Sequence, residues 1–141
     1  MVIKPKRGQR IQVNSSKLIY ELVNGIIASL EPFDRDKEHF FVIGVTRALT
    51  VRYIDWVTMG TMHATFVEPR EVFRNAILQG ASAVALSHNH PSGFPEPSRQ
   101  DKETNDKLVE AGKIIGIKII DHVIVADGAY YSFADEGRLN S

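Results

Sequence analysis

One stretch joins a short apolar run to a helical pattern, and we expect the rest of the chain to be organised around it. It reads His88-Asn-His-Pro-Ser-Gly-Phe-Pro-Glu-Pro-Ser-Arg-Gln-Asp101. The apolar run Ala81–Leu86 predicts a buried strand, and Ser98 suits the start of a helix. In an extended chain, residues i and i+2 point the same way, so both histidines can meet just past the strand. Open α/β sheets place ligand sites at that end of a strand. We therefore expect a strand–loop–helix unit with a site in its loop.

Working outward, hydrophobic periodicity predicts alternating helices and strands. Helical spacing of apolar residues indicates helices between Ser16 and Pro32, Pro69 and Gly80, and Ser98 and Gly116. The expected buried line of the last helix is Thr104, Leu108, Ala111 and Ile115. Strands are expected at Phe40–Val45, Leu49–Thr58, Ala81–Leu86, Ile117–Ala126 and Tyr130–Phe133. The order α-β-β-α-β-α-β-β predicts an α/β (α+β layered) fold, a mixed β-sheet flanked by helices.

Length and composition describe an ordinary globular domain. The chain has 141 residues, enough for one domain with its own core. It has no cysteine, which excludes disulfides, thiolate zinc fingers and a cysteine nucleophile. No apolar run reaches the length of a membrane span and no signal peptide is visible, so we expect a cytoplasmic location and no membrane partner. Nothing in the sequence indicates the oligomeric state.

Charge is balanced overall but not along the chain. The 17 basic and 17 acidic residues give zero net charge, which does not favour a dedicated DNA-binding domain. Residues 1–17 nevertheless contain five basic side chains and no acidic one. We predict a basic N-terminal arm over residues 1–16, solvated and partly disordered, followed by a single domain over 17–141. Contact of the arm with nucleic acid or an acidic partner is the alternative.

The loop carries the residues of a mononuclear zinc site. His88 and His90 offer two imidazoles, and Asp101 lies in the first turn of the following helix, where it can reach back. Two imidazoles and a carboxylate are the ligands of a hydrolytic zinc centre, whose fourth position is left for water. Solvated histidines and a Ser98–Asp101 capping box are the alternatives, and the capping and ligand roles are compatible. Such a site still needs a general base from elsewhere in the fold.

The pattern H88-x-H90-P91-x6-S98-x2-D101 resembles the JAMM (MPN+) motif of zinc metalloproteases. The text H-N-H-P-S-G is closer to the RadC-like JAB branch, and the resemblance runs from about Glu38 to Gly137. Further matching text lies at Pro69–Glu71, Asp121–Ile124 and Tyr131–Phe133. The resemblance implies a cytidine-deaminase-like JAB/MPN fold with Zn²⁺ on His88, His90 and Asp101. It also implies that Ser98 stabilises an oxyanion and that Glu38 is the catalytic glutamate.

Several residues keep alternative interpretations. Glu68 and Glu71 are rival bases, although they lie on another element. Asp121 and His122 are candidates for residues that hydrogen-bond and orient a zinc ligand. The alternative is a pair at a strand end that hydrogen-bonds only its own neighbours. We interpret His39 and His63 as ordinary histidines. Asn89 stands where deubiquitinating relatives commonly have serine or threonine, which weakens inferences about substrate.

The predicted function is a zinc-dependent hydrolase of the JAMM type. It would cleave peptide or isopeptide bonds of a protein or peptide substrate, with a zinc-activated water and Glu38 as general base. The alternatives are a DNA-repair or DNA-processing accessory protein and a non-catalytic zinc-binding interaction module. A nucleic-acid partner is not supported by the net charge. The absence of cysteine argues against a zinc deaminase.

Overall fold

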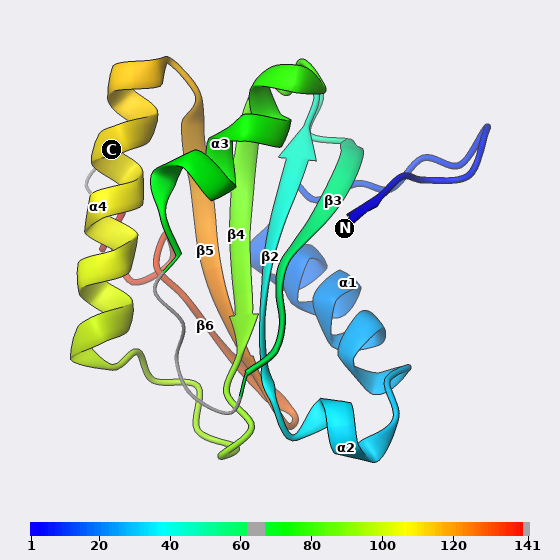
Figure 1. The fold of residues 1–141 in the computed structure, drawn as a ribbon, viewed down its shortest axis with the longest axis vertical. Helices are drawn as coiled ribbons and strands as arrows, with labels where there is room; N and C mark the ends of the chain where they lie inside the picture. Colours follow the sequence, from blue (N-terminus) through cyan, green and yellow to red (C-terminus); the bar gives the residue numbers. More distant parts are fainter. Residues whose placement is uncertain (62–66, 140–141) are drawn as a thin grey trace.

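A mixed β-sheet forms the centre of the computed structural model, which describes residues 1–61 and 67–139 (Figure 1). Within these residues the strand order is β1-β3-β2-β4-β5-β6, with β4 and β5 parallel and the other neighbours antiparallel. The strands are β1 (Val2–Ile3), β2 (Glu38–Val45), β3 (Val51–Thr61), β4 (Ala83–Asn89), β5 (Lys118–Ala126) and β6 (Ala129–Ser132). The two strands that carry the candidate site, β2 and β4, are thus neighbours in the middle of the sheet.

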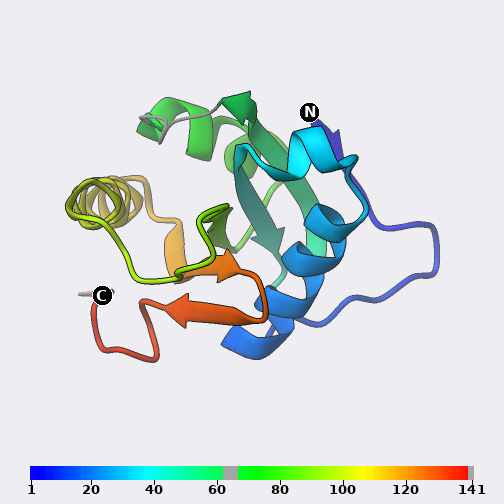
Figure 2. The ribbon, with the colours of Figure 1, turned by 90° about the horizontal axis from the view of Figure 1, so that it is seen from below.

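Helices cover both faces of this sheet. They are α1 (Ser16–Ala28), α2 (Pro32–Arg35), α3 (Pro69–Leu78) and α4 (Arg99–Ile115). Figure 1 shows α3 and α4 in front of the sheet and α1 behind it, and Figure 2 shows the same layers from below. This arrangement confirms the expected α/β layered fold. None of the described helices is long and apolar enough to cross a membrane.

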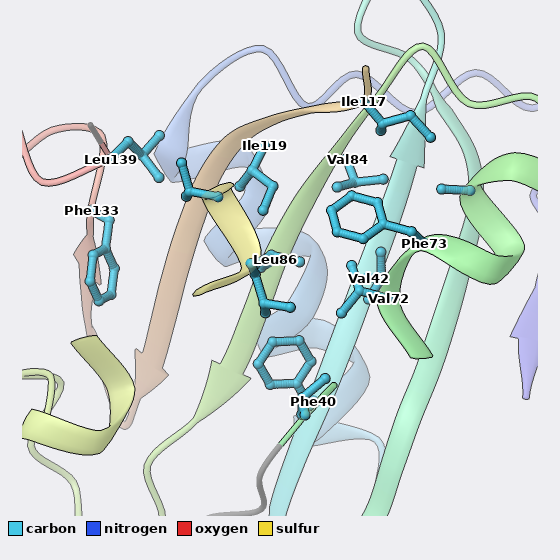
Figure 3. Packing of buried hydrophobic residues seen from close by; sticks show 14 of the residues in the cluster. Phe40, Val42, Val72, Phe73, Val84, Leu86, Ile117, Ile119, Phe133 and Leu139 are labelled. Atoms are coloured by element: carbon cyan, nitrogen blue, oxygen red, sulfur yellow. The ribbon is translucent and has the colours of Figure 1, made fainter. Parts of the chain in front are cut away.

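Two hydrophobic clusters, one on each face, hold the layers together. The cluster under α3 and α4 includes Val84 and Leu86 of β4 (Figure 3), whereas Ala83 and Ala85 belong to the cluster under α1. This division follows from the two-residue period of a strand. The same period carries His88 to the α4 side, where its ring stacks on Phe40 at a centroid distance of 5.8 Å. Core packing therefore sets the direction in which this histidine points.

The N-terminal residues make backbone and packing contacts with the rest of the domain. Val2 and Ile3 pair with Asp55 and Ile54 of β3, so β1 is a strand that the sequence patterns did not indicate. Val13 is buried and joins the cluster under α1. The segment between the first predicted helix and the strand expected at Phe40 contains the short helix α2. A two-residue strand is too short to produce a periodic signal, which explains why β1 was missed.

The buried face of α4 differs from the predicted one. Thr104 and Leu108 are buried as expected, but Ala111 is only partly buried and Ile115 is 42% exposed. The buried residues of this helix are Asp101, Thr104, Asn105, Leu108, Val109 and Gly112. Gly112 lies on this buried face, where a Cβ would overlap the backbone oxygen of Ile117 and lie 3.3 Å from the Phe73 ring. Asp101 and Asn105 share the buried face of α4 with this glycine.

Strands β2 and β3 contain another close contact that requires a glycine. Gly44 pairs with Tyr53 across the two strands, and a Cβ at Gly44 would overlap the Tyr53 ring. The ring is fully buried, and its hydroxyl has no hydrogen-bond partner among the described residues. Burial, together with the nearby Asp55 charge, raises the pKa of Tyr53. Tyr53 is therefore a neutral core residue, and its ring occupies the space that a side chain at Gly44 would fill.

Candidate metal centre

Three side chains from two elements converge beside the end of β4. His88 lies within the strand, His90 follows it directly, and Asp101 lies in the first turn of α4. One ligand atom from each residue lies within 4.8 Å of the other two. All three side chains are largely shielded from solvent, with 9%, 13% and 10% of their surface exposed. The three residues predicted from the loop are thus brought together and could hold a metal ion.

The tautomer of His90 is set by a backbone carbonyl. Its Nδ1 lies 2.9 Å from the oxygen of Phe94, and a carbonyl oxygen only accepts hydrogen bonds, so Nδ1 carries the proton. The lone pair is therefore on Nε2, which faces Asp101 Oδ2 at 3.0 Å and His88 Nε2 at 3.2 Å. In its neutral form, His90 presents the nitrogen that a metal needs toward the centre of the cluster.

A chain of side chains sets the tautomer of His88 in the same way. His88 Nδ1 lies 2.9 Å from His122 Nε2, and His122 Nδ1 lies 3.1 Å from Asn105 Oδ1. The amide oxygen of Asn105 accepts, so we assign the His122 proton to Nδ1 and a lone pair to its Nε2. His88 must then donate through Nδ1, which leaves its Nε2 lone pair facing the cluster. Metal-binding histidines are commonly oriented by such a second hydrogen bond.

The start of α4 holds Asp101 through a reciprocal pair of hydrogen bonds. The backbone N–H of Asp101 donates to Ser98 Oγ at 3.0 Å, and the backbone N–H of Ser98 donates to Asp101 Oδ2 at 2.9 Å. This is a capping box. Asp101 Oδ1 remains directed at His88 Nε2, 3.3 Å away. The capping interpretation is thus correct, and the same geometry aims the carboxylate at the two imidazoles.

Electrostatics favour an ionised carboxylate among these groups. Burial alone would favour the neutral acid, but the adjacent His88 and His90 side chains, with the backbone N–H of Ser98, hold the pKa of Asp101 far below its ordinary value. Burial works against a charged His90, yet its hydrogen bond to Asp101, with smaller contributions that include Glu38, raises its pKa. Asp101 is therefore an anion at neutral pH, which is the form that binds a metal.

Glu38 lies beside the same cluster, across a cleft of about 530 Å³. It is the first residue of β2, and the neighbouring pair Phe40 and His88 fixes the register of β2 against β4. Its negative charge is close enough to contribute to the raised pKa of His90. The described wall of the cleft consists of Asp36, Glu38, His90, Pro91, Ser92, Phe94, Glu96, Ser98, Gln100 and Asp101. Glu38 and Ser98 therefore share one cavity with two of the three ligands.

The other predicted residues separate into different environments. His122 is fully buried and contacts His88, and burial followed by the nearby His88 charge lowers its pKa well below the ordinary value. Asp121 accepts hydrogen bonds from Ser132, Ala134 and the His122 backbone, and burial raises its pKa. Of the pair, His122 hydrogen-bonds the candidate ligand His88, whereas among the described residues Asp121 hydrogen-bonds only its own neighbours.

The rival glutamates lie outside the described wall of the cleft. Glu71 Oε1 accepts from the Glu68 backbone at the start of α3, and Glu68 pairs with Lys107 at 3.4 Å. These are the contacts of a helix start and a surface ion pair. His39 is more constrained than expected, since its ring contacts both Asp34 and Trp56. His63 lies outside the described residues.

Sequence reasoning predicted no structural role for two asparagines. Asn105 lies four residues after Asp101 on the same face of α4, and this helical spacing was the only signal available for it. Asn89 stands between the two histidines and hydrogen-bonds the backbone on either side of Glu38. Its neighbours lie about fifty residues away in the sequence, so no local pattern could reveal them.

The donor set fits a small divalent metal ion. Two neutral imidazole nitrogens with inward lone pairs and one anionic oxygen are the usual ligands of a hydrolytic zinc site. The protons that could obstruct binding are held on the far sides of both rings, by Phe94 and by His122. The cleft beside Glu38 gives access to the cluster from solvent. These three observations support metal binding and do not identify the metal.

Comparison with known proteins agrees with this geometry. The model of the RadC-like JAB domain family matches residues 13–138, which adds α1 to the part covered by the sequence resemblance. A UPF0758 protein of Symbiobacterium thermophilum is 40% identical over 131 residues, 93% of this chain and 54% of the relative. A UPF0758 protein of Rubrobacter xylanophilus is 45% identical over 118 residues, 84% of this chain and 49% of the relative. The chain thus spans about half the length of these relatives, and it belongs to the RadC-like JAB domain family.

Proposed function

We propose that this chain is a zinc-dependent hydrolase of the JAMM type that cleaves peptide or isopeptide bonds. The observation that carries the proposal is the shared cavity, in which Glu38 and Ser98 line the same cleft as the ligands His90 and Asp101. A hydrolytic metal site requires a base beside the metal, and the fold places a carboxylate there. The cleft volume of about 530 Å³ lies in the usual range for ligand sites.

Each residue of the cleft has a defined role in this proposal. His88, His90 and Asp101 would hold the metal, which supplies Lewis-acid activation of water and of the scissile carbonyl when bound. Glu38 takes a proton from the attacking water and delivers it to the amine that leaves. Ser98 accepts a hydrogen bond through Oγ from Asp101 N, so its hydroxyl hydrogen remains available for donation to the oxyanion. Asp36 and Glu96 also line the cleft.

Metal analysis tests the first half of the proposal. Purified protein should hold one equivalent of zinc after reconstitution, and His88→Ala should lose it. His39→Ala is the matched control, because this buried histidine contacts Asp34 and Trp56 instead of the cluster. Retention of stoichiometric zinc by His88→Ala, with wild-type affinity, would show that the ligand assignment is wrong.

Turnover tests the second half. A library of fluorescence-quenched peptides and lysine-isopeptides should identify a substrate whose cleavage requires zinc. Glu38→Gln should keep the metal and lose turnover by about 10²-fold to 10⁴-fold, the usual contribution of a general base. Glu96→Gln, which alters another carboxylate in the same cleft, should keep most activity. Loss of activity in Glu96→Gln but not in Glu38→Gln would transfer the role of base to Glu96.

A second candidate function rests on a separate observation at the N-terminal arm. Gln12 pairs with Thr50, and Val13 N donates to Leu49 O, so the arm lies against the turn between β2 and β3. Exposed basic side chains on the arm, on this turn and on β3 form no ion pair with any described carboxylate. They are Lys4, Lys6, Arg7, Arg10, Arg47 and Arg52. A basic surface of this kind suits a polyanion, and it is the feature that favours a DNA-accessory role.

Salt-dependent binding distinguishes this second candidate. Labelled single-stranded and duplex DNA should bind with an affinity that falls steeply with salt, as counterion release requires. Lys6→Glu with Arg7→Glu should abolish binding, whereas Lys107→Glu with Lys113→Glu, which reverses two charges on α4, should not. Binding that is absent at low salt, or unaffected by the arm variant, would remove the DNA-accessory role.

A further inference from the structure

The side chain of Asn89 hydrogen-bonds the backbone on both sides of Glu38. Asn89 Oδ1 accepts from the backbone N–H of His39 at 2.7 Å, and Asn89 Nδ2 donates to the backbone oxygen of Lys37 at 2.9 Å. Asn89 is only 4% exposed. The two partners leave one orientation for the amide, because an N–H needs an acceptor and a carbonyl needs a donor. The residue between the two metal ligands therefore holds the residue proposed as base.

The end of the β2–β4 ladder explains why a side chain is needed here. Regular pairing of β2 with β4 stops at Phe40 and His88, whereas pairing with β5 continues, since Asn89 pairs with Val125 and His90 N donates to Val125 O. The backbone groups of Lys37 and His39 would consequently lose their partners on that side. Asn89 supplies both, since its amide offers the same donor and acceptor as a peptide group.

Contacts of the His39 side chain hold the Lys37–His39 segment from its other side. The ring of His39 lies 2.7 Å from the backbone oxygen of Asp34 through Nε2, and Trp56 Nε1 donates to its Nδ1 at 3.2 Å. His39 is therefore fixed to the α2 region and to β3, while its backbone is fixed to Asn89. The backbone of Glu38 is thus held from both sides, and the distance from β2 to the ligand strand depends on Asn89.

We propose that Asn89 is a positioning residue that sets the placement of Glu38 relative to His88 and His90. This rests on the proposed function, because it assumes that Glu38 acts beside a metal at that site. Catalytic groups must be held within a fraction of an ångström, so loosening the Lys37–His39 segment should weaken catalysis without removing any reacting group. A serine side chain at this position is too short to reach both backbone groups, so it cannot replace the two hydrogen bonds of Asn89.

The test compares Asn89→Ser with Ser87→Ala. Ser87 is also buried in β4, and its hydroxyl donates to Val123 O at 2.7 Å, away from the Lys37–His39 segment. Both variants lose buried hydrogen bonds of the same strand, and both should still bind one equivalent of zinc. On a substrate found with the peptide library, Asn89→Ser should lower kcat by about tenfold to 100-fold with little change in KM. Ser87→Ala should leave kcat near the wild-type value.

A second measurement needs no substrate. The pH midpoint of the Co²⁺ absorption spectrum should fall in Glu38→Gln, because removing a nearby negative charge makes loss of a proton easier. Asn89→Ser should shift the midpoint in the same direction, and it should cause no further shift in the Glu38→Gln background. Equal shifts by Asn89→Ser in both backgrounds, or no shift in either, would overturn the positioning role.

The two proposals fail in different ways. If Co²⁺ and Zn²⁺ do not bind, or Glu38→Gln changes neither the spectrum nor turnover, the proposed function itself is wrong. If Glu38→Gln has its expected effects and Asn89→Ser behaves like Ser87→Ala, only the role of Asn89 is wrong.

Discussion

His122 Nε2 lies 2.9 Å from His88 Nδ1, so a candidate metal ligand on β4 is oriented by a histidine of its parallel neighbour β5. His122 is fully buried and its ring stacks on Phe133 at 4.8 Å. The hydrogen-bond chain ends at Asn105 of α4. Three elements therefore determine which nitrogen of His88 faces the cluster.

Replacing Asn105 should weaken metal binding although this residue is not a ligand. Asn105→Leu removes the acceptor for His122 Nδ1, so the His122 proton is free to move to the nitrogen that faces His88. The dissociation constant for zinc should rise by about tenfold to 100-fold, as for other residues that orient ligands. Competition with a chromophoric chelator measures it. Asn105→Asp retains an acceptor oxygen and is the matched control; a wild-type constant in Asn105→Leu would contradict the orienting role.

The metal-free protein should lose stability in acid through His122. Burial holds the pKa of His122 well below 6.5, so the unfolded chain takes up this proton first as the pH falls. The contribution is complete above about pH 6.5 and declines below it, by about 1.4 kcal/mol per pH unit for one proton. The raised pKa of His90 acts in the other direction, because its contribution is present below about 6.5 and is lost as the pH rises through the folded-state value. Urea unfolding from pH 4.5 to 8 measures both.

His122→Asn separates these two contributions. The variant lacks the buried imidazole but keeps His90, so its free energy of unfolding should fall less steeply below pH 6.5 than that of the wild type. Equal slopes for the two proteins would show that His122 is not held neutral in the fold.

Tyr53→Phe should leave stability unchanged or raise it. The hydroxyl of Tyr53 is buried without a described partner, so its removal abolishes a desolvation cost, generally about 1–3 kcal/mol for such a group, and creates little empty space. Thermal and urea unfolding measure the change. A loss of more than about 1 kcal/mol would imply that the hydroxyl is hydrogen-bonded in solution.

Gly44→Ala should destabilise the protein by about 1–3 kcal/mol or more, because the added Cβ overlaps the ring of Tyr53. Gly25→Ala is the matched control, since a Cβ at this helical position meets nothing within 4 Å. The control should be neutral or slightly stabilising because alanine favours a helix. If the overlap is the cause, the double variant Gly44→Ala with Tyr53→Ala should lose less stability than the sum of the losses of the two single variants.

Local patterns were sufficient to predict the layered fold and the ligand cluster. The spacing of His88, His90 and Asp101 follows from one strand, one loop and one helix start, which are all contiguous in the chain. Ser98 was also predictable, because a capping box is a four-residue pattern. The identity of the metal and the roles of Glu38 and Ser98 remain predictions, since they depend on chemistry and not on placement alone.

Contacts between distant segments were not predictable in the same way. Asn89 acts on a backbone segment about fifty residues earlier, and its partners are main-chain atoms that leave no trace in the sequence. The buried face of α4 includes Asn105, Val109 and Gly112, whereas the spacing of apolar residues alone indicated Ala111 and Ile115. Packing across elements decided these positions.

The loop between His88 and Asp101 has a thermodynamic consequence as well as a chemical one. The two residues are 13 positions apart (101 − 88), and one belongs to a strand while the other begins a helix. A metal held by both would cross-link the two elements in a chain that has no cysteine for a disulfide. A covalent bridge around a loop of about 15 residues removes on the order of 3 kcal/mol of loop-closure entropy. A bound ion would fasten the start of α4 to the sheet. Removing it with a chelator should therefore lower the melting temperature and speed amide exchange in residues 91–98.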